Sequence, residues 1–129
     1  MSSTKDDVGA IVWTDLTVDN ASQLKDFYCE LVGWKTEPVP MAGYDDFNMI
    51  SPATGKSAAG ICHARGVNAD LPPQWLIYIT VEDVDKSAAR YIELGGKVLA
   101  GPKHMGDYGR YCVIQDIAGA VAALFEPAK

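Results

Sequence analysis

Residues 13–35 read WTDLTVDNASQLKDFYCELVGWK, and residues 76–98 read LIYITVEDVDKSAARYIELGGKV. A shift of 63 positions aligns the two stretches residue for residue. The identical pairs are Thr17 with Thr80, Val18 with Val81, Tyr28 with Tyr91, Glu30 with Glu93, Leu31 with Leu94 and Gly33 with Gly96. One repetition at this distance predicts a duplicated module that packs by pseudo-symmetry, and it differs from the short, many-fold period of a solenoid.

Each copy has the pattern of a strand followed by a helix. In the first copy, β-branched and aromatic residues at 10–18 predict a strand, and the apolar spacing of 21–32 predicts an amphipathic helix. Asn20 is expected to cap that helix and Gly33 to end it. The second copy repeats the order as a strand at 74–81, a cap at Asp83 and a helix at 84–94.

Three further extended segments follow each helix. They are expected at 34–40, 44–51 and 56–65 in the first half, and at 97–102, 109–116 and 120–127 in the second. The sequence therefore predicts an α+β protein made of two pseudo-symmetric βαβββ modules. We expect one domain over residues 1–129, with modules at about 9–66 and 74–127 and a linker at 66–73.

Composition limits the classes of partner. The chain has 129 residues, a formal net charge of −6 and a sequence pI of about 4.7, so its field repels nucleic acid. No segment has the apolar length of a membrane span or of a signal peptide. Three cysteines, far apart and without a CxxC pair, are typical of a reducing compartment, so we expect a cytoplasmic protein that binds neither nucleic acid nor membranes.

Several of these stretches resemble a known family. WTDLTVDNASQLKDFYCELVGW in the first half, and GRYCVIQDIAGAVAALFEP in the second, are similar to the glyoxalase/bleomycin-resistance/extradiol-dioxygenase superfamily, also called vicinal oxygen chelate proteins. The similarity runs from about Gly9 to Pro127. It implies that the modules curl into an open eight-stranded barrel-like cup with a binding site between them, and that two copies of the chain form a homodimer.

The resemblance also implies a set of metal-binding positions. Catalytic members of the superfamily bind a divalent ion through residues on the first and last strand of each module. Those positions fall here at Trp13, Leu76 and Ala123, with Ala59 as the approximate fourth. None of these side chains has an oxygen, imidazole or thiolate that a divalent ion requires. We therefore expect neither a metal nor another cofactor.

The remaining candidates come from strand phase and from the resemblance. Trp13, Asp15 and Thr17 share one face of the first strand, and the repeat places Leu76, Tyr78 and Thr80 at equivalent positions. By resemblance, the strands that also line the cup contribute Phe47, Met49, Tyr111 and Val113. Such a lining is mostly apolar and aromatic, which suits a small organic ligand. Asp15 and Tyr78 are the candidate acid/base residues, although Asp15 is about equally expected to be a structural carboxylate held by hydrogen bonds.

Other residues with reactive side chains are interpreted structurally. Asp45 and Asp46 are adjacent in sequence and are expected to be solvated turn residues. His63 is in phase with Ala59 near the end of a strand, where a surface position is favoured over a place at the rim of the cup. Cys62 and Cys112 lie in apolar strands, and burial there favours inert thiols.

Two classes of function remain. The first is a metal-free binding protein that holds a small apolar or aromatic compound, as in the bleomycin-resistance branch. The second is a lyase, isomerase or dioxygenase-type enzyme of the same superfamily, with Asp15 or a tyrosine as acid/base or with a non-standard metal site. The missing metal ligands favour the first class.

Overall fold

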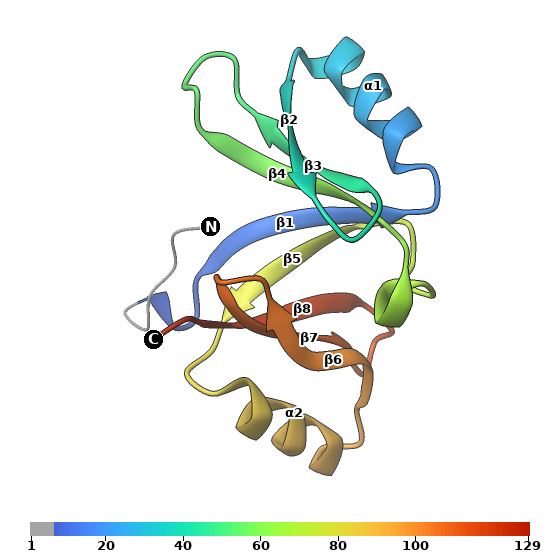
Figure 1. Cartoon of the computed structure of the whole chain (residues 1–129). Helices are drawn as coiled ribbons and strands as arrows, with labels where there is room; N and C mark the ends of the chain where they lie inside the picture. The colour runs from blue at the N-terminus through green and yellow to red at the C-terminus, as the bar shows by residue number, and fades with distance from the viewer. Residues whose placement is uncertain (1–6) are drawn as a thin grey trace. The chain divides into compact units, whose positions relative to one another are not determined.

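The computed structural model describes residues 7–129, and the elements within that range repeat a single order (Figure 1). The first series is β1 (Ile11–Val18), α1 (Ala21–Val32), β2 (Lys35–Pro40), β3 (Asp45–Ile50) and β4 (Ser57–His63). After a 3₁₀ turn (Gly66–Asn68), the second series is β5 (Trp75–Thr80), α2 (Val84–Glu93), β6 (Lys97–Met105), β7 (Gly109–Gln115) and β8 (Val121–Pro127). The predicted α+β class and the two βαβββ modules are confirmed.

The described residues form two compact units, which are residues 14–75 and residues 76–129 together with residues 7–13. The segment 66–73, expected as a linker, belongs to the first of these units. We call residues 14–75 the first unit and the other set the second unit. Among the described residues, no helix is both long and apolar enough to cross a bilayer.

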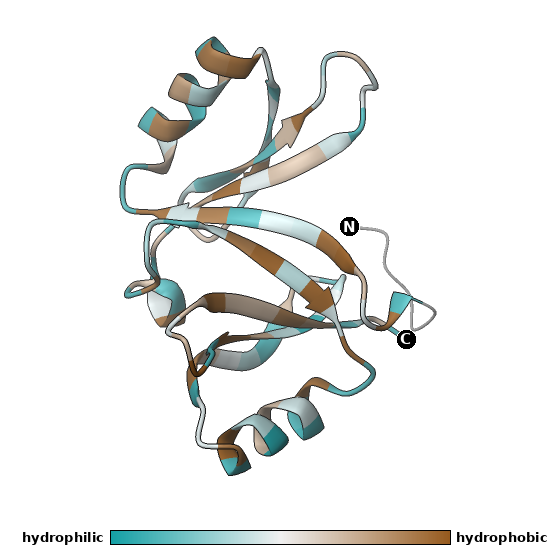
Figure 2. Ribbon diagram, turned by 180° about the vertical axis from the view of Figure 1, so that it is seen from behind, coloured by the Kyte–Doolittle hydropathy of each residue, from teal (hydrophilic) through white to brown (hydrophobic). Residues whose placement is uncertain are grey.

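In the first unit, one face of the sheet packs against α1. The strand order is β2-β3-β4-β1, with β1 parallel to β4 and the other neighbours antiparallel. Leu16, Ala21, Met49 and Ile61 form the core between this face and the helix. Figure 2 shows that α1 carries both hydrophobic and hydrophilic residues, as expected of a helix with one buried side.

The second unit repeats this arrangement with α2. Its strand order is β5-β8-β7-β6, with β5 parallel to β8. Val84, Ala88 and Cys112 form the core between the sheet and the helix. The Glu126 carboxylate accepts a hydrogen bond of 2.9 Å from the main-chain N–H of Val84, which connects β8 to the start of α2.

The two helices begin differently. Asp83 accepts a hydrogen bond of 3.0 Å from the Lys86 N–H, so it caps α2 as expected. Asn20 occupies the expected N-cap position of α1, but its side chain accepts no cap hydrogen bond, and its Nδ2 atom donates to the Gln23 side chain at 3.2 Å. The expected position is therefore confirmed, whereas the side-chain cap is absent. At the other end, Gly33 has the predicted left-handed conformation, with φ of 76°, and its N–H donates to the Cys29 carbonyl.

Candidate functional site

The face opposite α1 in the first unit carries polar side chains. Asp15 is aligned with Gly60, and Thr17 with Cys62, across the parallel pair β1 and β4. Residues that are aligned across a sheet point to the same side, so this face alternates with the core face that contains Leu16. Asp15 and Thr17 are only 5% and 4% exposed. The first unit therefore holds a buried carboxylate on the sheet face that α1 does not cover.

A second buried carboxylate shares this face. Asp46 precedes Phe47, which is aligned with Ile61 of β4, so Asp46 is opposite Cys62. Burial raises the pKa of the Cys62 thiol well above its usual value, and the negative charges of Asp15 and Asp46 raise it further. A hydrogen bond between the thiol and the Asp46 carboxylate acts in the same direction. Cys62 consequently remains a thiol that donates to Asp46, and it is not a nucleophile.

Asp46 also holds His63, and this pairing was not found from the sequence. One carboxylate oxygen of Asp46 accepts the main-chain N–H of His63 at 2.9 Å and lies 3.1 Å from its Nδ1 atom. Asp46 is 9% exposed, whereas the neighbouring Asp45 is exposed. The expected turn was wrong for both residues, which lie in β3, and the expected solvation holds only for Asp45. The antiparallel pairing of β3 with β4 turns Asp46 inward.

His63 is half-buried between aromatic rings. The centre of its ring lies 5.3 Å from that of Tyr44 and 6.1 Å from that of Phe47. The surface position favoured for His63 was therefore wrong, since its side chain is only 15% exposed. Its ring is oriented by Asp46 and by these neighbours.

The face opposite α2 in the second unit is apolar and aromatic. Tyr78 is aligned with Ala123, which is aligned in turn with Val113. Tyr111 is aligned with Phe125 on the same face, and the rings of Tyr78 and Tyr111 have their centres 6.2 Å apart. Leu76 has the same strand phase as Tyr78 and is fully buried. The structure thus places Leu76, Tyr78, Tyr111 and Val113 on one face, as their sequence positions indicated.

Phe47 and Met49 do not lie on the corresponding face of the first unit. Met49 is fully buried in the α1 core with Leu16 and Ile61, and Phe47 packs against that core. The expectation that they lie on the same face as Asp15 was wrong. Side chains alternate between the two faces of a strand, so the residues of β3 on the face of Asp15 are those next to Phe47 and Met49 in the sequence. The polar face carries Asp46 and Asn48 instead, and Asn48 is aligned with Gly60.

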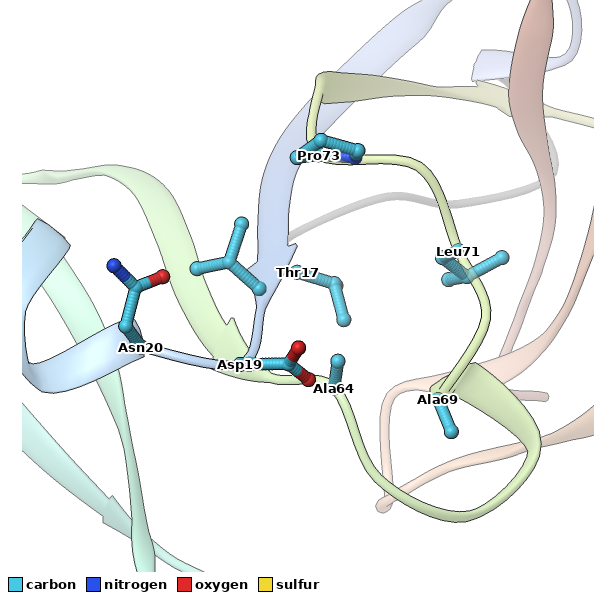
Figure 3. A pocket seen from close by; sticks show the side chains of 8 residues that line it. Thr17, Asp19, Asn20, Ala64, Ala69, Leu71 and Pro73 are labelled. Carbon is cyan, nitrogen blue, oxygen red and sulfur yellow. The ribbon is translucent and has the colours of Figure 1, made fainter.

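A small hollow lies at the end of β1 in the first unit (Figure 3). It has a volume of about 200 Å³, which is below the usual range for drug-sized ligands. Thr17, Val18, Asp19, Asn20, Ala64, Ala69, Leu71 and Pro73 line it. In Figure 3, Ala69 and Leu71 of the segment after β4 lie across from Thr17, Asp19 and Ala64. Sequence reasoning missed this hollow, because 66–73 was interpreted only as a linker.

The comparisons with known proteins agree with this architecture. Residues 10–124 match the model of the Glyoxalase/Bleomycin resistance protein/Dioxygenase superfamily. The chain belongs to this superfamily. The crystal structure of methylmalonyl-CoA epimerase from Mycobacterium tuberculosis has a TM-score of 0.59 and 18% identity, and the match covers 100% of this chain and 93% of that one. At such identity the likeness concerns the fold alone.

Two curated relatives of this superfamily member are longer proteins. CFP32 of Mycobacterium bovis, named as a candidate glyoxylase, is 32% identical over 115 residues, which are 88% of this chain and 44% of that protein. The anthracycline biosynthesis protein DnrV of Streptomyces peucetius is 29% identical over 129 residues, covering 91% of this chain and 46% of that one. This chain spans about half the length of the curated relatives it matches.

The side chains of this superfamily member do not fit the divalent metal found in catalytic members. Asp15 and Tyr78 occupy equivalent positions in the repeat. The strand pairing aligns Asp15 with Gly60 and Tyr78 with Ala123, so the counterpart of Ala123 in the first unit is Gly60. The expected position, Ala59, was therefore one residue too early. Trp13, Leu76, Ala123 and Gly60 all lack a metal-ligating atom in their side chains. Within residues 7–129, no group of three or more His, Cys, Asp or Glu side chains is arranged to hold a metal ion.

Proposed function

We propose that this protein binds a small, largely apolar or aromatic molecule without a metal ion. In the first unit the proposed contact surface is the sheet face opposite α1, with Asp15 as its polar residue. In the second unit it is the face opposite α2, with Tyr78 as its polar residue. The observation that carries the proposal is the buried Asp15 carboxylate, on a face that the α1 core does not use. Trp13, Thr17, Leu76, Tyr111 and Val113 are the further proposed contacts. Met49 is left out because it belongs to the α1 core, and Phe47 because it lies on the α1 side of the sheet.

The residue types on these faces support an organic ligand. Tyr78, Tyr111 and Val113 are aromatic or apolar side chains, and a buried carboxylate can fix the orientation of a ligand that carries a hydrogen-bond donor. The lack of donors at the superfamily's metal positions favours binding by burial and hydrogen bonds over coordination. One relative is named for anthracycline biosynthesis, a name compatible with an aromatic ligand.

The second candidate is an enzyme of the lyase, isomerase or dioxygenase type. Asp15 favours it, because a carboxylate that is 5% exposed and lies near Cys62 and Asp46 is in the surroundings where catalytic acids and bases occur. In this reading Asp15 or Tyr78 transfers a proton to or from the bound molecule. Turnover of the ligand, detected by chromatography, separates an enzyme from a binding protein.

A ligand screen tests the proposal. Apolar and aromatic small molecules should raise the melting temperature, since a ligand that binds only the folded state stabilises it. Asp15→Asn should weaken the binding of the best compound about tenfold, as expected when a charged hydrogen-bond partner is lost. Asp45→Asn is the matched control, because Asp45 is an exposed carboxylate of the same unit. Equal affinities of the two variants would remove Asp15 from the site.

We also propose that the protein is a cytoplasmic homodimer. Its curated relatives are about twice as long, so two copies of this chain would match the length of one such relative. All three cysteines are free thiols, which suits a reducing compartment. Sedimentation analysis tests the dimer, and a concentration-independent monomer would contradict it.

A further inference from the structure

His63 is held so that one ring nitrogen is left for a ligand. The Asp46 carboxylate accepts one hydrogen bond from the His63 main-chain N–H, and a carboxylate facing Nδ1 makes Nδ1 the protonated ring nitrogen. In the neutral ring, Nε2 is then the hydrogen-bond acceptor. Among the described residues, no hydrogen bond to Nε2 is found, and the side chain keeps 15% of its surface exposed. Nε2 is therefore an acceptor that a ligand can reach.

A positive charge stacks on one of the rings that contact His63. The guanidinium carbon of Arg65 lies 3.9 Å from the centre of the Tyr44 ring, which also contacts the His63 ring. Within residues 7–129, Arg65 has no carboxylate at ion-pair distance, although acidic residues outnumber basic ones by 17 to 11. Arginine presents several N–H donors in a plane that matches a carboxylate. Stacking on Tyr44 holds this donor set on the ring that contacts His63, and it leaves the N–H donors unused.

We propose that His63 and Arg65 form a binding site for a small hydroxy-aromatic carboxylate. Arg65 binds the carboxylate, Nε2 of His63 accepts a hydrogen bond from the hydroxyl group, and the Tyr44 and Phe47 rings contact the aromatic part. Asp46 is a positioning residue, because it orients the imidazole without touching the ligand. The site does not depend on what binds the faces opposite α1 and α2.

Nuclear magnetic resonance of the imidazole nitrogens tests the acceptor. At about pH 8, where imidazole is ordinarily neutral, His63 should show the Nδ1–H tautomer. His104, the other histidine, is exposed and serves as the internal reference. Asp46→Asn should abolish the tautomer preference, whereas Asp45→Asn should keep it. An Nε2–H tautomer in the unmodified protein would overturn the proposal.

Titration with 4-hydroxybenzoate tests the ligand class. It should shift the His63 imidazole signals saturably, and benzoate and phenol should each bind more weakly because each lacks one of the two polar groups. Arg65→Ala should reduce the affinity about tenfold, as expected for a charge-assisted contact. Arg65 is exposed, so this variant should fold. Arg90→Ala is the control, since Arg90 is an exposed arginine paired with Glu93 on α2.

The outcomes of the titration are decisive in both directions. Unchanged affinity in the Arg65 variant, or the absence of saturable shifts, would refute the site. Equal shifts at His104 would do the same, because they would indicate a bulk effect of the ligand on exposed imidazoles. Asp15→Asn should leave this titration unaffected, so the failure of one site can be told from the failure of the other.

Discussion

The two units share a topology but present opposite chemistry on the faces that their helices leave uncovered. Asp15 and Tyr78 are equivalent in the repeat, as are Gly60 and Ala123. In the first unit the face carries two buried carboxylates, and in the second it carries two tyrosines and a valine. Backbone pairing and the helix-side core need only apolar side chains on one face, so the other face was free to diverge after duplication.

The largest difference in stability is expected between truncations of Phe125 and Cys62, which are equivalent in the repeat. Phe125→Ala should lower the free energy of unfolding by about 3–5 kcal/mol, because Phe125 is 1% exposed and its truncation leaves a cavity. Cys62→Ala should cost about 1 kcal/mol or less, since it removes only a thiol. Urea unfolding measures both. Similar losses would mean that the two faces are packed alike.

Alkaline pH should test a property that the two units share, which is a thiol whose pKa is raised by burial. The pKa of Cys62 is raised well above its usual value by burial and by Asp15 and Asp46, and the pKa of Cys112 is raised to about 11 by burial and by Asp85. Both pKa values are higher in the folded protein than in the unfolded chain, so their contribution to stability is complete below about pH 8.5 and is lost as the pH rises.

The loss should reach at most about 1.4 kcal/mol per pH unit for each thiol. Urea unfolding between about pH 8 and 10.5 measures it. Cys62→Ala and Cys112→Ala should each flatten the profile by up to this slope, because each removes one thiol whose pKa is raised in the folded protein. A profile that Cys62→Ala leaves unchanged would contradict the raised pKa of Cys62.

The helix caps should give a smaller effect. Asp83→Ala should destabilise the protein by about 1 kcal/mol, because it removes the hydrogen bond to the Lys86 N–H. Asn20→Ala should cost only a few tenths of a kcal/mol, since the Asn20 side chain bonds Gln23 instead of the helix backbone. Thermal or urea unfolding of the two variants distinguishes them. A cost of the Asn20 variant equal to that of Asp83 would restore the expected cap.

Metal addition should give no effect in either unit. After exposure to nickel, zinc, iron and manganese, elemental analysis should find no stoichiometric ion, because Trp13, Leu76, Ala123 and Gly60 offer no side-chain ligands. A chelator should leave the melting temperature unchanged. One bound ion per chain would show that other residues rebuild a metal site, and it would favour the enzyme reading.

The sequence by itself determined the duplicated βαβββ order and the faces of β1 and β5. These follow from local periodicity and from the 63-residue repeat, which act over a few neighbouring residues. It also indicated that the metal positions lack ligands. The family resemblance supplied Tyr111 and Val113, which the structure places on the same face as Tyr78.

Only the tertiary structure decided which face of β3 carries the polar residues and that Asp46 orients His63. These two residues are 17 positions apart, and their meeting depends on the register between β3 and β4, which shifts near Met49. A strand's side-chain period is two, so a register error of one residue exchanges its faces. The segment Asp45–Ile50 contains apolar and polar residues in both phases, and only packing against α1 selects Met49 for the core.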